Sequence, residues 1–285
     1  MSLKNTKFNI NSHIFSTESI SVMGILNLTQ DSFYDGGKYL EEKSIISKCK
    51  KMLDEGAAII DIGAQSSRPG ANQLSSKEEL KTLLPVIKLL KKNFNNITIS
   101  IDTFWSNSAQ QCIQAGAHII NDISAGEIDK NMFSTIAKLN IPYIIMHMQG
   151  TPQNMQQNPS YKDVTKEVIH YFKNKIKALH KLNFYKIIID PGFGFGKTIK
   201  HNYELLNNLQ TFKKLQLPIL TGTSRKSMIY NLLDTNAESA LNGTSITNTI
   251  AIQNGTNILR VHDVKEAIEC IKITTFAKNN CEWNF

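Results

Sequence analysis

Eight short apolar runs in this 285-residue chain each end in residues that can form hydrogen bonds or carry a charge. One polar residue after a strand is usually a helix cap or a turn residue, but eight together indicate a shared site. The polar ends are Asn27, Asp61, Asp102, Asn121, His147, Asp190, the stretch from Thr223 to Lys226, and Arg260 with His262.

Two sets of residues with different chemistry stand out. The first offers both acceptors and donors, as a flat heteroaromatic ring with amide and amino edges requires. It consists of Asp102, Asn121, Asp190 and Lys226. The second suits an anion or a metal-bound anion. It consists of Asn27, Arg68, Arg260 and His262.

Arginine is scarce in this chain. Of 32 basic residues, 29 are Lys, and Arg occurs only at positions 68, 225 and 260. Such a chain is expected to keep Arg where Lys cannot serve, in forked contacts to phosphate or carboxylate or in stacking on a flat ring. Arg225 precedes Lys226 and is also expected to be a structural ion-pair partner.

Composition excludes several classes of protein. The net charge is +8, but the Lys residues occur in ones and twos, which favours solvated helix faces over a nucleic-acid stripe. No stretch approaches the roughly 20 apolar residues of a membrane helix. Residues 1–11 lack the hydrophobic core of a signal peptide, so a cytoplasmic protein is expected. The four Cys form no C-x-x-C pair, which favours reduced, buried thiols.

The apolar runs alternate with longer amphipathic stretches, a pattern that predicts strand and helix units. The runs begin near Ile20, Ala57, Ile97, His118, Ile141, Lys186, Pro218 and Asn257. Runs such as AAIIDIG are nearly continuous in apolar residues, which is typical of strands buried on both faces of a parallel sheet. Eight units predict one α/β domain over residues 1–285, a closed (β/α)8 TIM barrel, with residues 1–19 as an extra strand or hairpin at the barrel floor. An open doubly wound sheet is the alternative.

Local signals predict where some helices begin and how regular they are. Ser75 to Glu78 has the pattern of a capping box, and Pro85 is expected to bend or shorten the helix that follows. The stretch after the seventh run contains Gly243 and several Thr, so it is predicted to be helical mainly from its place in the series.

The strand ends carry motifs that closely resemble dihydropteroate synthase, a (β/α)8 enzyme family of folate synthesis. They run in the family's order from about residue 20 to residue 270. The motifs are GILNLTQDSF (24–33), SSRPG (66–70), SIDT (100–103), INDI (120–123), MHMQG (146–150), DPGFGFGK (190–197), SRK (224–226) and RVHD (260–263).

The resemblance implies an activity. It is the condensation of 6-hydroxymethyl-7,8-dihydropterin diphosphate with p-aminobenzoate to give 7,8-dihydropteroate and diphosphate, by a dissociative substitution with Mg²⁺ on the diphosphate. Because carbon–oxygen cleavage releases diphosphate, the developing negative charge requires cations or a metal. The family is the target of sulfonamides. The resemblance also implies a homodimer through late barrel helices. The expected partners are small-molecule substrates, with neither nucleic acid nor membrane.

The same resemblance assigns roles by position. The metal contact is Asn27. The implied diphosphate-binding residues are Asn27, Ser67, Arg68, Arg260 and His262. The implied pterin-binding residues are Asp102, Asn121, Met146, Asp190, Phe195 and Lys226. The implied p-aminobenzoate-binding residues are Phe33, Ser66, Arg68, Pro69 and Ser227. The implied catalytic residues are Arg68, Lys226, Arg260 and His262.

Other positions keep a less specific interpretation. His147 is expected either to orient its neighbours or to cap its strand, and GFGFGK is expected to form a pocket wall because it lacks P-loop spacing. The stretches 29–38 and 65–74 are expected to be lids over the p-aminobenzoate site. Three positions depart from the family pattern: Gln30 where Pro is common, Gln65 where Glu is common, and Ser67 where Thr is common.

Three other functions fit parts of the sequence. A pterin-binding methyltransferase acting with a corrinoid protein shares the fold and the pterin acids, but it does not need Arg68, Arg260 and His262 for a diphosphate. A Schiff-base aldolase would use Lys226. A nucleic-acid binder requires clustered cations and exposed aromatic residues, which the sequence lacks.

Overall fold

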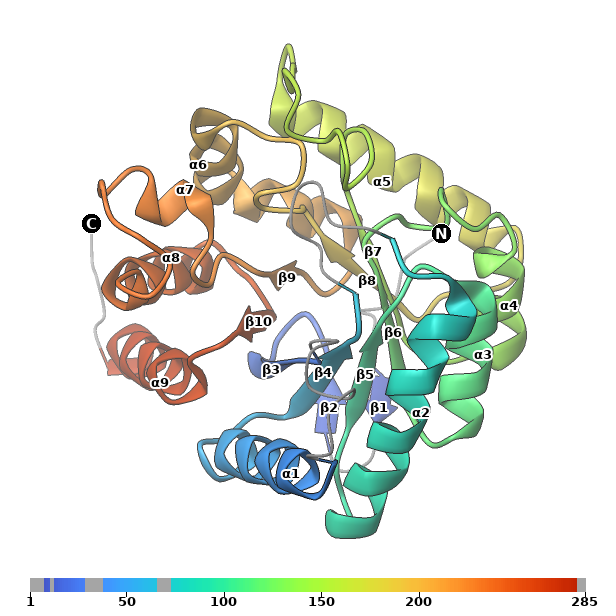
Figure 1. Cartoon of the computed structure of the whole chain (residues 1–285). Helices are drawn as coiled ribbons and strands as arrows, with labels where there is room; N and C mark the ends of the chain where they lie inside the picture. The colour runs from blue at the N-terminus through green and yellow to red at the C-terminus, as the bar shows by residue number, and fades with distance from the viewer. Residues whose placement is uncertain (1–7, 11–12, 29–37, 66–72, 281–285) are drawn as a thin grey trace.

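Eight parallel strands form the centre of the molecule (Figure 1), in a computed structural model that describes residues 8–10, 13–28, 38–65 and 73–280. Their order is β8-β7-β6-β5-β4-β3-β10-β9. The strands are β3 (Ser21–Asn27), β4 (Ile59–Gly63), β5 (Ile99–Asp102), β6 (Ile119–Asp122), β7 (Tyr143–Met146), β8 (Ile187–Asp190), β9 (Leu220–Thr221) and β10 (Ile258–Val261). A bridge between Ile189 and Ile219 joins β8 to the start of β9. The sheet therefore closes into the predicted barrel, and the open-sheet alternative is wrong.

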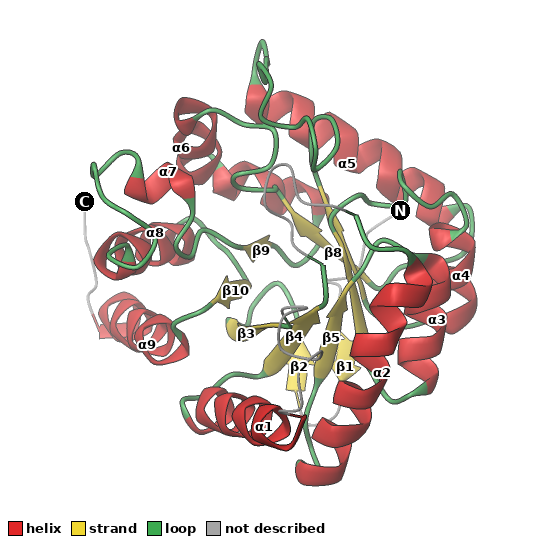
Figure 2. Ribbon diagram, viewed as in Figure 1, coloured by secondary structure: helices red, strands yellow, loops and turns green. Residues whose placement is uncertain are grey.

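Helices surround the strands on the outside of the barrel (Figure 2). They are α1 (Lys38–Asp54), α2 (Ser76–Asn93), α3 (Ser106–Gln114), α4 (Met132–Leu139), α5 (Val164–His180), α6 (Ile199–Asn207), α7 (Ser227–Tyr230), α8 (Leu241–Gln253) and α9 (Val264–Asn280), with a 3-10 helix at Leu209–Leu215. None of the helices in the described ranges is long and apolar enough to cross a membrane.

The strands separate two apolar clusters, because successive side chains point to opposite faces. Outward residues such as Ile60, Ile101 and Leu259 pack with the helices in one large core. Inward residues form a smaller cluster inside the barrel. Its members are Ile10, Met23, Ile59, Ile119, Ile144, Ile188, Leu220 and Ile258. Most of these residues lie at the amino ends of their strands, so the barrel is filled there and its polar inward residues lie at the opposite, carboxyl ends.

The amino-terminal segment contributes to the inner cluster. Strands β1 (Phe8–Ile10) and β2 (His13–Phe15) pair antiparallel as a hairpin. Ile10 is buried and packs with the inward residues at the amino ends of the barrel strands. The hairpin therefore adds an apolar side chain to the end of the barrel opposite the polar residues.

Local expectations for the helices met different outcomes. Ser75 and Glu78 form the predicted capping box of α2. The expectation that Pro85 shortens this helix is wrong, because α2 continues for 18 residues with Pro85 inside it. Its buried residues, among them Leu83 and Leu90, lie on both sides of Pro85 and hold the helix to the core. Helix α8 is present as predicted, and Gly243 lies against Ile229 with no room for a Cβ.

Candidate active site

The carboxyl ends of neighbouring strands bring the polar residues into register. Gly63 of β4 pairs with Asp102 of β5, and Asp102 pairs with Asn121 of β6. A Cβ at Gly63 would lie 3.4 Å from the Cβ of Asp102 and 3.7 Å from Oδ1 of Asn27. Asn27, Gly63 and Asp102 therefore lie at the same level of the barrel, and a Cβ at Gly63 would make ordinary van der Waals contact with both neighbouring side chains.

Arg260 is the centre of a charged network across the barrel. Its Nε donates to Oδ2 of Asp61 at 2.7 Å, and its Nη2 donates to Oδ2 of Asp102 at 2.9 Å. Nδ2 of Asn121 also donates to Oδ2 of Asp61, at 3.0 Å. One guanidinium thus binds carboxylates from β4 and β5. Asn121, from the set suited to a heteroaromatic ring, and Arg260, from the set suited to an anion, share Oδ2 of Asp61 as an acceptor.

Burial and charge act in opposite directions on this network. Desolvation raises the pKa of Asp102 above that of an ordinary aspartate, and the neighbouring Arg260 charge works against that rise. The Asp61 and Asp102 carboxylates raise the pKa of Arg260. Arg260 therefore stays charged, and its charge limits the rise in the pKa of the half-buried Asp102, which still reaches about 7.

Lys226 is held against the loop that follows β8. Its Nζ donates to the carbonyl oxygen of Phe193 at 2.6 Å and lies 4.7 Å from the centre of the Phe195 ring. Gly194 has φ +80°, and a Cβ there would lie 3.2 Å from Cδ of Lys226. Desolvation lowers the pKa of Lys226 to about 8, and Asp190 opposes this change. The amine is therefore charged at neutral pH but close to its titration range.

Asp190 ends β8 beside the same loop. Its Oδ1 accepts from the backbone N–H of Gly192 at 2.8 Å. Burial raises its pKa, while Lys226, Arg260 and Lys197 lower it through their charges. The carboxylate thus depends on three surrounding cations for its ionised state.

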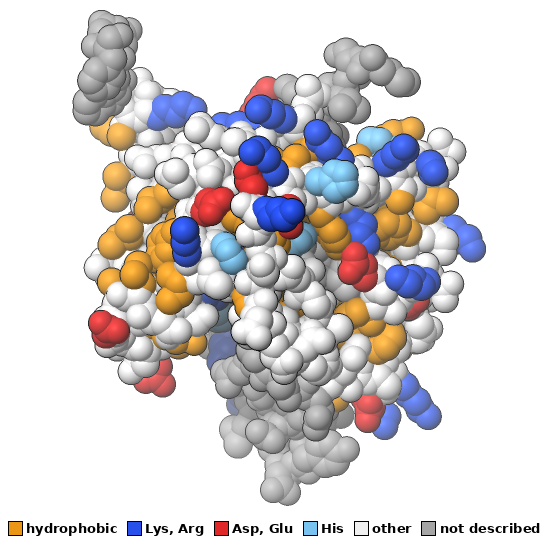
Figure 3. All heavy atoms as spheres, turned by 90° about the horizontal axis from the view of Figure 1, so that it is seen from above, with side chains coloured by type: hydrophobic (Ala, Val, Ile, Leu, Met, Phe, Trp, Pro, Cys, Tyr) orange, Lys and Arg blue, Asp and Glu red, His pale blue; other side chains and the backbone are white. Residues whose placement is uncertain are grey.

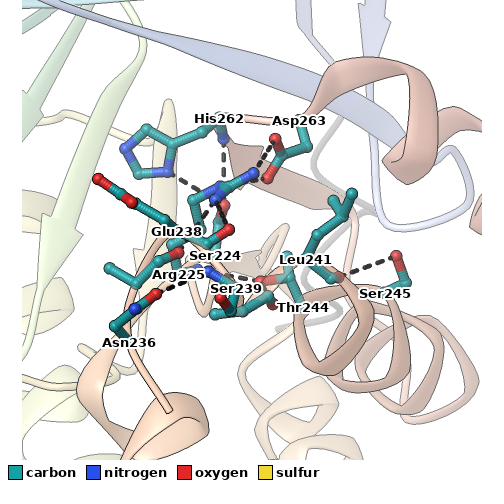
Figure 4. A network of polar contacts seen from close by, with 12 residues as sticks. Ser224, Arg225, Asn236, Glu238, Ser239, Leu241, Thr244, Ser245, His262 and Asp263 are labelled. Carbon is teal, nitrogen blue, oxygen red and sulfur yellow. Dashed lines mark hydrogen bonds and ion pairs between the residues drawn. The ribbon is translucent and has the colours of Figure 1, made fainter.

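His262 and Arg225 belong to a second network, in the loop after β9 and at the end of β10 (Figure 4). The hydroxyl of Ser224 accepts from the backbone N–H of His262 and lies 3.1 Å from its Nδ1. If the Ser224 hydroxyl donates to Nδ1, the neutral ring carries its proton on Nε2. Burial and the Arg260 charge lower the pKa of His262 to about 4, so the ring is neutral at pH 7.

Arg225 makes structural contacts, as expected. Its Nε and Nη2 each donate to one carboxylate oxygen of Asp263, both at 2.8 Å, and its Nη1 donates to the carbonyl oxygens of Ala237 and Glu238. Its backbone has φ +54°. Arg225 therefore fixes the loop from β9 to α8 onto the end of β10, next to Lys226.

An apolar wall borders the polar residues. It consists of Phe104, Ile123, Met146, Met148, Met155 and Phe195, with Trp105 and Ile128 packed against it. Met146 and Phe195 are both buried within this cluster. The two residues expected near the pterin ring therefore share one surface, and Phe195 also touches Lys226.

The remaining predicted residues have different outcomes. Ser227 is the first residue of α7 and is half-buried. Residues 29–37 and 66–72 of the two expected lids lie outside the described residues. They include five residues with predicted roles: Phe33, Ser66, Ser67, Arg68 and Pro69.

Two residues make contacts in the site although no role was predicted for either. Asp61 is fully buried in the middle of β4 and accepts from both Arg260 and Asn121. The sequence predicted Asp61 as the polar end of its run, but the strand continues through Ile62 to Gly63. Lys197 is also buried, and it contacts Nδ1 of His147 at 3.0 Å. His147 therefore orients a neighbour, which was one of its two expected roles.

Comparisons with known proteins identify the family. A family model described as "Pterin binding enzyme" matches residues 23–262. Dihydropteroate synthase of Escherichia coli K12 is 41% identical over 91% of this chain and 93% of its own length. The enzyme of Clostridium beijerinckii is 40% identical over 96% and 98%. The chain belongs to the dihydropteroate synthase family.

Solved structures of the family agree with the fold. The Yersinia pestis dihydropteroate synthase, determined with a sulfonamide drug, covers 96% of this chain and all of its own, with 37% identity and a TM-score of 0.89. The Xanthomonas albilineans enzyme, determined with 4-aminobenzoic acid, has 33% identity and a TM-score of 0.86 over 96% of this chain and 99% of its own. The comparisons give no support to the methyltransferase alternative.

Proposed function

We propose that the chain condenses 6-hydroxymethyl-7,8-dihydropterin diphosphate with p-aminobenzoate to give 7,8-dihydropteroate and diphosphate. The observation that carries this proposal is the position of Arg260 between Asp61 and Asp102, because it places an anion-binding guanidinium directly beside the acceptors of a heteroaromatic site. The two contacts use two of the five N–H donors of a guanidinium, and its other donors suit a phosphate oxygen.

The pterin is proposed to bind against the apolar wall with its edge toward the polar residues. Asp102 and Asp190 accept from N–H groups of the ring, and Lys226 donates to its acceptors. Asn121 donates its Nδ2 proton to Asp61, which directs Oδ1 as an acceptor toward the ligand. Met146 and Phe195 supply the apolar contact. A site that pairs every edge group discriminates strongly against rings that lack them.

The proposed chemistry is a dissociative substitution. The bond between the pterin methylene carbon and the diphosphate oxygen breaks, and the electron pair leaves with the diphosphate. Arg260 and the Nε2 proton of His262 stabilise the leaving group, and the carboxylate of Asp102 stabilises the cationic pterin. The amine of p-aminobenzoate then attacks the methylene carbon and loses a proton to solvent. Arg68 and Ser67 are proposed to assist at the diphosphate.

Mg²⁺ is proposed as the cofactor, bound mainly through the substrate. Magnesium is commonly held by one or two protein oxygens together with phosphates and water. The described residues contain no group of three His, Cys, Asp or Glu that would form a protein-only metal site. Asn27 fits the remaining requirement, because it offers one side-chain oxygen at an exposed strand end beside Asp102. The ion would neutralise charge on the diphosphate.

The p-aminobenzoate is proposed to bind beside Lys226, with its carboxylate near Ser227. Phe33, Ser66, Arg68 and Pro69 complete this part of the proposal. It is supported by the place of Ser227, which directly follows Lys226 at the start of α7. The Xanthomonas albilineans relative was determined with 4-aminobenzoic acid, which supports p-aminobenzoate as a substrate of this chain.

The direct test is turnover. The protein is incubated with the pterin diphosphate, p-aminobenzoate and Mg²⁺, and both products are quantified. We expect diphosphate and dihydropteroate in equal amounts, with no product when either substrate is omitted. Absence of diphosphate release, together with demethylation of methyltetrahydrofolate in the presence of a corrinoid protein, would show that the methyltransferase alternative is correct.

We also propose that the chain forms a homodimer through α8 and α9. Ile246 of α8 and Ile273 and Phe276 of α9 are large apolar residues that are 52%, 69% and 71% exposed. The two helices lie side by side (Figure 1), so these residues belong to one side of the barrel. Sedimentation is expected to give a dimer for the wild type and a monomer for Ile273→Glu. A monomeric wild type would contradict this proposal.

The face of the molecule seen in Figure 3 gives no support to a nucleic-acid role. On the face seen in Figure 3, Lys and Arg side chains are dispersed among polar and apolar residues and form no continuous stripe. Binding to a phosphate backbone depends on clustered cations. The positive charge of the chain is therefore best explained as solvated lysine on helix faces.

A further inference from the structure

The loop after β8 is fixed to the end of β7 by a buried lysine. Lys197 is 4% exposed, and its Nζ lies 2.9 Å from the carbonyl oxygens of both Gly192 and Phe195 and 3.0 Å from Nδ1 of His147. A fourth acceptor, the carbonyl oxygen of His147, lies at 3.3 Å. The three shorter contacts match the three protons of an ammonium group.

The backbone of the loop is adapted to this close approach. Gly192 has φ +76°, and a Cβ there would overlap the carbonyl oxygen of His147. Gly196 has φ +60°, and a Cβ there would lie 2.5 Å from the carbonyl oxygen of Gln149. The loop therefore packs backbone to backbone against the segment after β7, and Lys197 donates to both sides of that contact.

The same loop provides the surroundings of Lys226. The carbonyl oxygen of Phe193 accepts from its Nζ, the Phe195 ring lies 4.7 Å from that atom, and Gly194 lies against its side chain. Lys197 does not need to touch a substrate to influence the site. A movement of the loop changes the position of both the acceptor and the aromatic ring beside Lys226.

We propose that Lys197 is a positioning residue for the pterin side of the site, which it supports by tying the loop 192–196 to the end of β7. This inference rests on the proposed pterin-binding function. The lysine acts through Phe193 and Phe195 on Lys226, and through its charge on Asp190.

The charges around Lys197 make the proposal testable by pH. The groups that face it are His147 directly after β7, Asp190 from β8 and Lys226 before α7, with Tyr161 and Tyr171 packed against the His147 ring. Burial lowers the pKa of Lys197 to about 7, and its positive charge lowers the pKa of Asp190. Loss of the charge therefore raises the pKa of Asp190, and Asp190 becomes protonated at a higher pH.

The experiment compares Lys197→Met, Lys197→Gln and the control Lys200→Met, which changes an exposed lysine three residues away. The affinity for the pterin diphosphate is measured by calorimetry, and the pH profile of kcat/KM by turnover. Lys197→Met is expected to weaken pterin binding about tenfold, to leave the KM for p-aminobenzoate unchanged, and to move the acid limb to higher pH. Lys197→Gln retains two N–H donors and is expected to recover part of the affinity, and Lys200→Met is expected to match the wild type.

A double-mutant cycle with Phe195→Leu separates positioning from a general loss of stability. If Lys197 acts through the loop, Lys197→Met has a smaller effect on pterin affinity in the Phe195→Leu background. Additive effects, or a folded Lys197→Met variant with wild-type pterin affinity and acid limb, would overturn the inference. If Lys197→Met does not fold, the comparison of Lys197→Gln with the wild type tests the inference by the same two measurements, the pterin affinity and the position of the acid limb. Loss of turnover in the wild type would overturn the proposed function instead, because pterin affinity is measured without turnover.

Discussion

Arg260→Lys is the substitution that tests the role of the guanidinium most sharply. It keeps a positive charge on β10 but removes the planar fork. Arg260 reaches Asp61 at 2.7 Å and Asp102 at 2.9 Å through two different nitrogens. A lysine ammonium is a single point, so it contacts one of these carboxylates well and leaves the other buried without its charged donor.

The size of the effect follows from the loss of one charge-assisted hydrogen bond. Such a bond contributes about 1.5–3 kcal/mol, which corresponds to a fall in kcat/KM of roughly 10- to 150-fold. A larger fall in kcat/KM would indicate that the guanidinium also contacts the transition state. The loss of an aligned contact to the diphosphate would then add to the loss of the hydrogen bond to the carboxylate.

Steady-state kinetics with varied pterin diphosphate measure this effect. Arg225→Lys is a matched control, because Arg225 also forms a forked ion pair, here with Asp263, but its other contacts are to backbone carbonyls of the loop between α7 and α8. We expect Arg225→Lys to act mainly on stability: it lowers the melting temperature and has only a small effect on kcat/KM. Near-normal turnover of Arg260→Lys would refute the reasoning, since neither the fork nor the plane would then matter.

The other predictions concern Lys226, pH and the metal. Lys226→Met is expected to weaken pterin binding more than p-aminobenzoate binding, and unchanged pterin affinity by calorimetry would exclude its assigned role. The profile of kcat/KM against pH is expected to be bell-shaped. Lys226 loses its proton as the pH rises through about 8, which gives the basic limb. Asp102 and Asp190 are protonated as the pH falls, and because burial raises the pKa of both, the acid limb lies above the range of an ordinary aspartate. An acid limb at pH 4 or below would contradict the effect of burial. Removal of Mg²⁺ by a chelator is expected to abolish turnover, and Asn27→Ala is expected to raise the concentration of Mg²⁺ needed for half-maximal activity, whereas an unchanged requirement would remove Asn27 from the metal site.

The sequence was most informative about the barrel strands. Each predicted run began within two residues of an observed strand, because strands buried on both faces leave a nearly continuous apolar signal, as at Ile59–Gly63. The polar ends of these runs also indicated the site, since all parallel strands of a barrel end on the same side. The resemblance supplied the role of each residue, which the pattern alone did not.

Pairings across the barrel were not predictable in the same way. Asp61 and Arg260 lie 199 positions apart in the sequence. They meet because β4 and β10 both pair with β3, so that only one strand lies between them in the closed sheet. The role of Lys197 was missed for a related reason. Its sequence neighbours indicated a pocket wall, but its partner His147 comes from a different strand. The short helix α7 and the 3-10 helix Leu209–Leu215 carried no periodic signal because of their length.

The persistence of α2 through Pro85 shows how packing outweighs a local preference. Proline removes one backbone donor within a helix and typically costs about 3 kcal/mol. Leu83, Val86 and Ile87 flank this position and are almost completely buried. Burial of a large aliphatic side chain contributes about 1.5–3 kcal/mol, so three such residues exceed the cost of the proline.

The most direct test of the central claim is a crystal structure with the pterin diphosphate bound. We predict that the edge of the pterin ring lies within hydrogen-bonding distance of Asp102, Asn121, Asp190 and Lys226, with the diphosphate at Arg260 and His262. A pterin bound away from the carboxyl ends of the strands, or a diphosphate that contacts neither Arg260 nor His262, would contradict the account.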